Sequence, residues 1–392
     1  MQYRLDEKSG NKLSALGLGC MRLPRNMGRT DMDKTEGVIL EAINKGVNFF
    51  DTAYIYPGSE VALGAVLHKN KVREKVYVAS KLPLFKCQTY DDFDKIFKEQ
   101  LDRLKTTYID YYFMHNIIKL SDWERLCTLG IEKWIQEKKD QGKIKQVGFS
   151  FHGMRAEFIQ LIDAYDWDFT MIQYNYVNTN YQAGEHGLKY AYGKGVPVFI
   201  MEPLLGGLLA NALPDKAAKL LREHSLDATP ASWALRWLWN QKEVTLVLSG
   251  MNHIDQVLEN TTLAGQSPVG NMTSQELGLI DKVAEVFSAS YKIPCTGCNY
   301  CLPCPKHINI PDSFMSYNTS YSISRFAGIT QYATTSGGLR SSFSLYDCTQ
   351  CGKCEQNCPQ HIKIVDSIKV VRKRMEPLWY RWLIFLLRKF MS

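Results

Sequence analysis

The sequence predicts an α/β fold: a closed (β/α)8 TIM barrel followed by a smaller, cysteine-rich C-terminal domain. At 392 residues, the chain is too long for one small domain. Eight short apolar, β-rich segments alternate with helical patterns before residue 290, which is typical of a parallel sheet that closes into a barrel. Eight of the 11 cysteines lie in the last hundred residues, which indicates a separate unit. We therefore expect the barrel over residues 1–288 and the second domain over residues 289–392.

The eight expected strands follow one another along the first part of the chain. They are "SALGLGC" (14–20), "VNFFDTA" (47–53), "KVYVASKL" (75–82), "IDYYFMH" (109–115), "KQVGFSF" (145–151), "FTMIQYNY" (169–176), "VPVFIMEP" (196–203) and "VTLVLSG" (244–250). Segments with helical periodicity lie between them, among them residues 91–105, 122–142 and 155–165. A doubly wound open sheet is the structural competitor. Because the first strand–helix junction lacks a G-x-G-x-x-G phosphate loop, we favour the barrel.

The composition is ordinary for a globular protein, with 45% hydrophobic and 22% charged residues. No stretch of eighteen apolar residues occurs, and the start, "MQYRLDEKSG", is charged. We therefore expect neither a transmembrane helix nor a secretory signal. These features predict a cytoplasmic protein, in which clustered cysteines bind metals more often than they form disulfides.

Two cysteine runs, "CTGCNYCLPCP" (295–305) and "CTQCGKCEQNCP" (348–359), carry the strongest motif of the chain. The second has the C-x2-C-x2-C-x3-C-P spacing of two-cluster bacterial ferredoxins, in which three cysteines hold one cluster and the fourth reaches the other. We therefore expect two [4Fe–4S] clusters. One would be held by Cys295, Cys298, Cys301 and Cys358, and the other by Cys348, Cys351, Cys354 and Cys304. Two structural zinc sites are the alternative, but zinc is usually held by separated C-x2-C pairs.

The charge of the cysteine-rich part supports a cofactor there. Residues 291–392 carry 13 lysines and arginines and 5 acidic residues, a net charge of +8, whereas the whole chain is at +7. Two oxidised clusters, at about −2 each with their thiolates, would offset roughly half of that charge. Because no nucleic-acid motif accompanies the basic residues, we expect no nucleic-acid partner.

Three consecutive expected strands end in ionisable residues, and barrel enzymes carry their chemistry at strand ends. Asp51 ends the second strand with Tyr56 just beyond it, Lys81 ends the third, and His115 ends the fourth. Each could be structural by itself. Together they form a proton donor, because an ammonium lowers the pKa of a nearby tyrosine and a carboxylate orients the ammonium. The set predicts proton transfer to a carbonyl oxygen during hydride transfer, with His115 either donating to the same oxygen or helping its proton exchange with solvent.

The segments "FFDTAYIYPGSEVALG", "YVASKL", "IDYYFMHN", "GFSFH", "IQYNYVN" and "SGMNHIDQVLEN" resemble the aldo/keto reductase superfamily over nearly all of the first 285 residues. With the cysteine runs, the chain is similar to an iron–sulfur branch of that superfamily. The resemblance implies catalytic roles for Asp51, Tyr56, Lys81 and His115, and NAD(H) or NADP(H) across the C-terminal mouth of the barrel. It places Ser150 and Gln173 at the nicotinamide carboxamide, and Gly250, Met251, Gln256, Glu259 and Asn260 at the adenosine end.

The chain departs from that family at several positions. Phe151 stands where members often have asparagine, and Met201 where they often have an aromatic residue. Gly250, Asn252 and Gln256 are neutral where many members bind the 2′-phosphate of NADP through basic side chains. These neutral residues slightly favour NADH.

The resemblance implies a small carbonyl or alcohol substrate, but the role of the clusters is open. A hydride carries two electrons, a cluster accepts one at a time, and no flavin motif connects them. The clusters could relay electrons from an external ferredoxin-like partner, hold the tail in place, or reduce a carbonyl by one electron to a ketyl-type radical. We favour the relay slightly over the structural role, and both over the ketyl. A non-catalytic electron-carrier subunit would leave the four strand-end residues unexplained.

The segment "PLWYRWLIFLLRKFM" (377–391) is apolar with interspersed arginine and lysine, and it is too short to span a bilayer. We expect a helix that packs on the protein. The less favoured alternative is an interfacial anchor with Trp379 and Trp382 at the lipid headgroups. Residues 313–338 predict a helix and a loop.

Overall fold

The computed structural model describes residues 1–225, 228–322, 324–335 and 344–391. The chain divides into two compact units. The first comprises Met1–Leu204 and Ser232–Ser274, and the second comprises Leu205–Ala231 and Gln275–Ser392. These compact units divide the chain at positions other than residue 288, and the domain boundary expected there stays a prediction.

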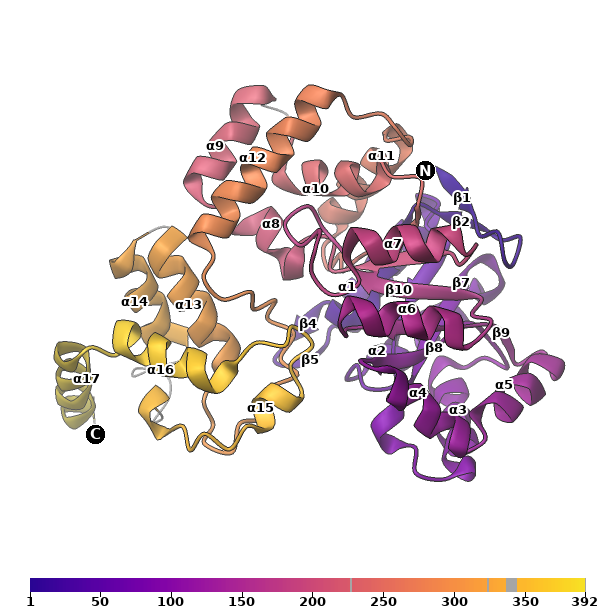
Figure 1. The fold of residues 1–392 in the computed structure, drawn as a ribbon, viewed down its shortest axis with the longest axis horizontal. Helices are drawn as coiled ribbons and strands as arrows, with labels where there is room; N and C mark the ends of the chain where they lie inside the picture. The colour runs from indigo at the N-terminus through magenta and orange to yellow at the C-terminus, as the bar shows by residue number, and fades with distance from the viewer. Residues whose placement is uncertain (226–227, 323, 336–343, 392) are drawn as a thin grey trace. The chain divides into compact units, whose positions relative to one another are not determined.

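Eight parallel strands close into a barrel in the order β10-β11-β12-β3-β6-β7-β8-β9, which confirms the predicted fold class (Figure 1). The strands are β3 (Leu16–Gly19), β6 (Phe49–Asp51), β7 (Tyr77–Pro83), β8 (Ile109–Ile117), β9 (Ile144–Phe151), β10 (Phe169–Gln173), β11 (Val198–Met201) and β12 (Val244–Ser249). Each lies within or overlaps one of the eight expected segments. Two short antiparallel pairs stand outside the barrel, β1 (Tyr3–Leu5) with β2 (Lys12–Ser14), and β4 (Arg25–Asn26) with β5 (Arg29–Thr30).

The strand register brings the predicted reactive residues to neighbouring strand ends. Asp51 on β6 pairs with Ala79 on β7, two residues before Lys81. Lys81 in turn pairs with Phe113 on β8, two residues before His115. Because parallel strands end at the same rim of a barrel, all these side chains belong to its C-terminal mouth.

Helices follow the strands as a (β/α)8 barrel requires. They are α1 (Met32–Asn44), α2 (Ser59–Lys69), α3 (Tyr90–Leu104), α4 (Leu120–Thr128), α5 (Ile131–Asp140), α6 (Arg155–Ala164), α7 (Gly184–Gly193), α10 (Pro230–Trp239) and α11 (Ile254–Gln266). The continuous helical pattern over residues 122–142 forms two helices, α4 and α5. Gly130 separates them, because its φ of +89° lies in the left-handed region and ends the first helix.

The barrel interior is filled mainly by large aromatic side chains. Phe49, Tyr111, Phe169 and Phe199 are fully buried in one cluster of strand residues. The rings of Phe49 and Phe199 are 5.2 Å apart between centroids, and those of Tyr111 and Phe169 are 5.1 Å apart, both edge to face. This layer makes the barrel a packed core, so the strand ends are rigid supports for the site.

The second compact unit is helical. Its elements are α8 (Leu208–Asn211), α9 (Asp215–His224), α12 (Ser274–Ser290), α13 (Ile310–Ser322), α14 (Arg325–Thr335), the short 3-10 turn η5 (Leu345–Asp347), α15 (Lys353–Gln356), α16 (Ile364–Met375) and α17 (Leu378–Met391). Residues 313–338 contain most of α13 and all of α14 instead of one helix and a loop. A Cβ on Gly328 would stand 2.6 Å from the Ser316 carbonyl oxygen, so glycine allows the two helices to cross closely. Residues 336–338 of this segment lie outside the described residues.

Among the described residues, no helix is both long and apolar enough to cross a membrane.

Candidate active site and cysteine-lined pockets

Asp51 and Lys81 form a buried ion pair at the ends of β6 and β7. The Lys81 ammonium donates hydrogen bonds to the Asp51 carboxylate and to the Thr52 carbonyl oxygen, the latter at 2.8 Å. Burial lowers the pKa of Lys81, and the Asp51 carboxylate opposes this effect. Burial likewise raises the pKa of Asp51, and the Lys81 charge opposes it. The lysine is therefore fixed in position, with Asp51 favouring its charged form.

Tyr56 and His115 lie against this pair. The Lys81 nitrogen is 5.0 Å from the centroid of the Tyr56 ring. The His115 ring meets the Tyr56 ring edge to face, with 5.8 Å between centroids. Burial, followed by the charge of Lys81, lowers the pKa of His115 well below its ordinary value, so its imidazole is neutral at neutral pH. The structure thus brings together all four residues for which the sequence predicts catalytic roles.

A buried carboxylate, which sequence reasoning missed, lies behind the ion pair. Glu60, in the first turn of α2, accepts hydrogen bonds from Ser80 Oγ at 2.6 Å and Gln100 Nε2 at 2.8 Å. It also accepts one from an Arg103 guanidinium nitrogen at 3.1 Å. Gln100 Nε2 lies 3.2 Å from the carbonyl oxygen of Lys81, to which it also donates. The network ties the backbone of Lys81 to α2 and α3. Sequence reasoning missed Glu60 because a glutamate in the first turn of a helix is common.

Gln173 and Ser150 stand where a nicotinamide carboxamide is expected. Gln173 ends β10 and is completely buried, yet neither its amide oxygen nor its amide nitrogen has a hydrogen-bond partner among the described residues. Ser150 Oγ, on β9, accepts a hydrogen bond from the backbone N–H of Asn116 at 2.9 Å. Because buried polar atoms are nearly always paired, the Gln173 amide fits a ligand with both a donor and an acceptor, as a carboxamide has.

The five residues expected at the adenosine end gather where β12 ends and α11 begins. They are Gly250, Met251, Gln256, Glu259 and Asn260. Met251 is buried, Gln256 Oε1 accepts from the backbone N–H of Asn252 at 2.9 Å, and Asn260 Nδ2 donates to Ser249 Oγ at 3.4 Å.

The structure places a basic residue, Arg22, beside Gly250, one of the neutral residues expected at the adenosine end. A Cβ built on Gly250 would lie 3.8 Å from Cβ and 3.9 Å from Cδ of Arg22. Arg22 follows the first barrel strand within a short 3-10 turn and is exposed. Sequence reasoning missed it because no motif marks a lone arginine there.

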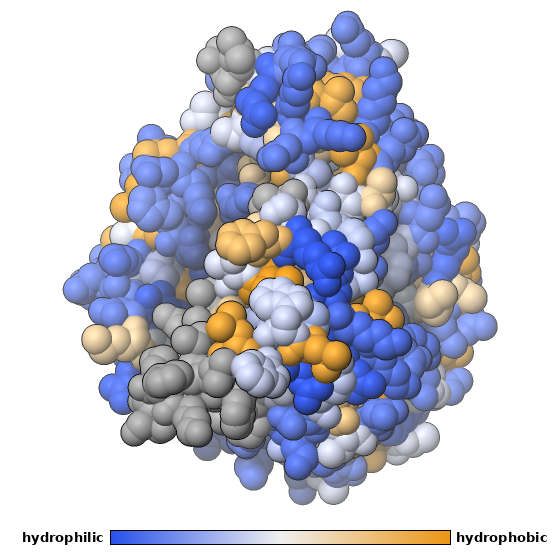
Figure 2. Space-filling view, turned by 90° about the vertical axis from the view of Figure 1, so that its left-hand side faces the viewer, coloured by the Kyte–Doolittle hydropathy of each residue, from blue (hydrophilic) through white to orange (hydrophobic). Residues whose placement is uncertain are grey.

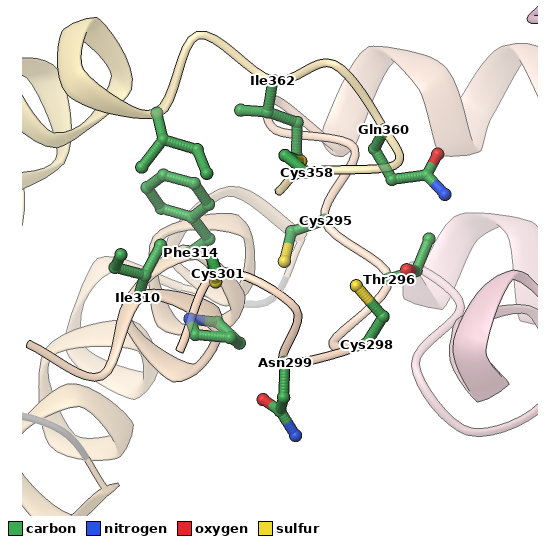
Figure 3. A pocket seen from close by; sticks show the side chains of 12 residues that line it. Cys295, Thr296, Cys298, Asn299, Cys301, Ile310, Phe314, Cys358, Gln360 and Ile362 are labelled. Atoms are coloured by element: carbon green, nitrogen blue, oxygen red, sulfur yellow. The ribbon is translucent and has the colours of Figure 1, made fainter. Parts of the chain in front are cut away.

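The cysteines of the second unit line two pockets. Cys295, Cys298 and Cys301 line the first together with Cys358, and the walls include Phe314 and several isoleucines (Figure 3). The first pocket thus takes one cysteine from the second run. Figure 3 shows the sulfur atoms of Cys295 and Cys298 pointing toward the same part of the pocket.

The second pocket combines three cysteines of the second run with cysteines of the first run. Cys348, Cys351 and Cys354 line it together with Cys304 and Cys301. Lysines also line this pocket, Lys306 and Lys353, and both are exposed. None of the cysteines in the described part of the chain forms a disulfide, and no group of three or more His, Cys, Asp or Glu residues there is arranged for a single metal ion. Thiol groups around an apolar-walled space are the donor set that an iron–sulfur cluster requires.

Comparison with known proteins gives the class of this protein. A model of the Aldo/keto reductase family matches residues 15–285, and a model of the 4Fe-4S dicluster domain matches residues 294–363. The chain is therefore an oxidoreductase with an iron–sulfur domain. It belongs to the aldo/keto reductase family, as the sequence resemblance implies.

Individual relatives match somewhat less than three quarters of this chain. L-galactose dehydrogenase from Arabidopsis thaliana is 27% identical over 310 residues, which cover 73% of this chain and 95% of the plant protein. L-glyceraldehyde 3-phosphate reductase from Escherichia coli K12 is 24% identical over 331 residues, 72% of this chain and 92% of that one. The holo form of aldo-keto reductase AKR11C1 from Bacillus halodurans superimposes with a TM-score of 0.60 at 25% identity, covering 73% of this chain and 97% of that chain.

A second solved structure supports the fold alone. It is an aldo-keto reductase from Klebsiella pneumoniae in complex with NADPH, with a TM-score of 0.61 and 18% identity. The match covers 72% of this chain and 95% of that chain.

Proposed function

We propose that this protein catalyses the nicotinamide-dependent reduction of an aldehyde or ketone, or the reverse oxidation of an alcohol. The observation that carries the proposal is the buried Asp51–Lys81 pair beneath the Tyr56 ring, with a neutral His115 against the same ring. A bound nicotinamide supplies the hydride to the carbonyl carbon. Tyr56 donates the proton to the carbonyl oxygen, and Lys81 favours the phenolate that results.

Each protein group has one part in this reaction. Asp51 holds the Lys81 ammonium in place, and the Thr52 carbonyl oxygen restrains it from a second direction. Because His115 is neutral, it can donate a hydrogen bond to the substrate oxygen without adding a positive charge beside Lys81. The buried position of these groups excludes water, which strengthens their electrostatic effect on the oxygen.

We assign the nicotinamide end of the cofactor to Ser150 and Gln173. The adenosine end is assigned to Gly250, Met251, Gln256, Glu259 and Asn260. Arg22 beside Gly250 adds a positive charge for a cofactor phosphate. With this arginine nearby, the neutral residues at positions 250, 252 and 256 no longer argue against NADPH, and we propose NADH or NADPH as the cofactor.

We further propose that the second unit holds two [4Fe–4S] clusters with crossed ligation. Cys295, Cys298, Cys301 and Cys358 would hold the first, and Cys348, Cys351, Cys354 and Cys304 the second; both sets line pockets in the structure. When bound, such clusters transfer one electron each. The exposed Cys351 and the exposed lysines of the second pocket favour a relay to an external ferredoxin-like partner, since acidic redox partners dock on basic surfaces.

A structural role for the clusters is the second candidate. Cys358 and the isoleucines around the first pocket belong to the hydrophobic core of the second unit. A cluster in that pocket would therefore also hold the fold together, because metal binding energy adds to folding energy. Cysteines that serve as cluster ligands need a reducing compartment, so we propose a cytoplasmic location.

The test compares wild-type protein and Tyr56→Phe on a panel of aldehydes and ketones with NADH and with NADPH, under anaerobic conditions. The variant keeps the ring and loses only the proton donor. We expect carbonyl reduction to fall by about a hundredfold or more while nucleotide binding persists. Near-normal turnover by the variant would show that another group supplies the proton. No turnover by the wild type with any carbonyl would contradict the proposal.

A further inference from the structure

Over residues 378–384, the part of helix α17 whose side chains the structure describes, one face packs on the second unit. Tyr380 and Ile384, four residues apart, are buried in the core of that unit. The adjacent side chains are exposed, with Leu378 at 81%, Trp379 at 56%, Trp382 at 70% and Leu383 at 46% of full accessibility. These form two i,i+4 pairs, 378 with 382 and 379 with 383, so they make one continuous apolar stripe along the outside of the helix.

The orientation of the helix is fixed by aromatic and basic side chains. Arg372 of α16 and Arg381 of α17 both lie against the ring of Tyr346, at 4.7 Å and 4.5 Å from its centroid. The start of α17 is therefore joined to α16 and to the segment before Cys348. Because this joint holds the helix with Tyr380 inward, the apolar stripe stays on the outer surface.

The sequence around the stripe is rich in basic residues, of which Lys369 is paired with Asp366 at 2.8 Å. Residues 369–391 contain seven lysines and arginines and a single acidic residue, Glu376. Glu376 is buried and accepts hydrogen bonds from Tyr332, Ser344 and the backbone N–H of Leu345, so it contributes little negative charge to the surface. Figure 2 looks onto the side on which α17 lies in Figure 1, and it shows hydrophobic surface gathered beside strongly hydrophilic surface.

We propose that α17 binds the surface of an anionic phospholipid bilayer. Leu378, Trp379, Trp382 and Leu383 enter the boundary between headgroups and acyl chains, and the exposed Arg381 meets the lipid phosphates. Tryptophan prefers this boundary because its ring is apolar and its N–H is polar. With 14 residues the helix is about 21 Å long, shorter than the ~30 Å hydrocarbon core, so it lies in the plane of the surface.

Charge favours a lipid surface over a second copy of this chain as the partner of the apolar stripe. Two copies packed stripe to stripe would bring like-charged surfaces together, which opposes association. An anionic bilayer offers the complementary charge, worth about 1 kcal/mol for each lysine or arginine near the surface. The apolar stripe and its basic surroundings are together the composition of an interfacial helix.

The experiment measures sedimentation of the full-length, cluster-loaded protein with vesicles. One set contains phosphatidylcholine alone, and the other contains phosphatidylcholine with phosphatidylglycerol. We expect binding to the anionic vesicles that weakens with added salt, and little binding to the neutral ones. Trp379→Ser with Trp382→Ser should weaken binding by about tenfold or more, and Arg381→Gln by about fivefold.

A matched control removes exposed apolar groups elsewhere, by Val61→Ser with Val269→Ser, which should leave vesicle binding unchanged. Iron content and circular dichroism establish that each variant is folded, and the salt dependence of the wild type tests the proposal without any variant. Equal binding to neutral and anionic vesicles, or no binding to either, would overturn it. Concentration-dependent dimers that the double tryptophan variant abolishes would also overturn it, because a second copy would then cover the stripe.

Discussion

Replacing Glu60 by glutamine tests whether the network behind the ion pair contributes to catalysis. The substitution keeps the shape of the side chain and removes its charge. Glu60 accepts three hydrogen bonds, from Ser80, Gln100 and Arg103, and is almost completely buried. A glutamine can accept with its oxygen only, and its NH2 group then faces another donor. We therefore expect at least one of the three donors to lose its partner.

The magnitude follows from those contacts. Losing the charge-assisted bond to Arg103 costs about 2 kcal/mol, and leaving one buried donor unpaired costs about 1 kcal/mol or more. The free energy of unfolding should therefore fall by about 3 kcal/mol. The charge of Glu60 raises the pKa of Lys81. Without it, burial lowers that pKa further, the ammonium is lost at lower pH, and the alkaline limb of the kcat/KM profile shifts to lower pH.

The assays are thermal unfolding and carbonyl reduction across pH. Glu99→Gln is the matched control, because Glu99 also pairs with Arg103, at 3.2 Å, but its side chain is 40% exposed. We expect this control to cost less than about 1 kcal/mol and to leave the pH profile in place. If Glu60→Gln behaves like the control in both assays, Glu60 has no positioning role and the reasoning is wrong.

Two further predictions concern the cofactors. Cys358→Ser should lower iron from about eight towards four per chain, and the remaining electron paramagnetic resonance signal should be that of the cluster at Cys348. Cys304→Ser is its counterpart and should spare the other signal; the reverse pattern would contradict the crossed ligation. Arg22→Ala should raise KM for NADPH by about tenfold with little change in kcat, because it removes one charge-assisted contact to a phosphate. Identical KM values for variant and wild type would show that Arg22 does not touch the nucleotide.

The barrel could be predicted from the sequence because each strand is an apolar, β-rich run that a helical pattern follows. It also placed Asp51 at the end of β6, whereas β7 and β8 each run two residues beyond Lys81 and His115, which were expected to end them. The grouping of the two cysteine runs followed from spacing alone. Each pocket is lined by the four cysteines that this spacing groups together, and the second pocket also by Cys301. The ligand set itself stays a prediction.

Features that depend on tertiary contacts could not be predicted. Glu60, Gln100 and Arg103 meet only because α2 and α3 pack together. The break between α4 and α5 was missed because helical periodicity continues on both sides of Gly130. For α17, the expected packing is confirmed by Tyr380 and Ile384, but the sequence does not show that Leu378, Trp379, Trp382 and Leu383 stay exposed.

The unpaired amide of Gln173 has a thermodynamic consequence for the whole barrel. An unsatisfied buried polar group costs about 1–3 kcal/mol, and neither of the two amide atoms of Gln173 has a partner in the part of the chain that the structure describes. In the proposed complex, the nicotinamide carboxamide removes this cost, and the gain adds to the ordinary stabilisation of the native state by any ligand that binds it. The concentration of nucleotide in the cell would then affect how long the enzyme stays folded as well as its rate of turnover. Enzyme without bound nucleotide would unfold more readily than enzyme that has bound it.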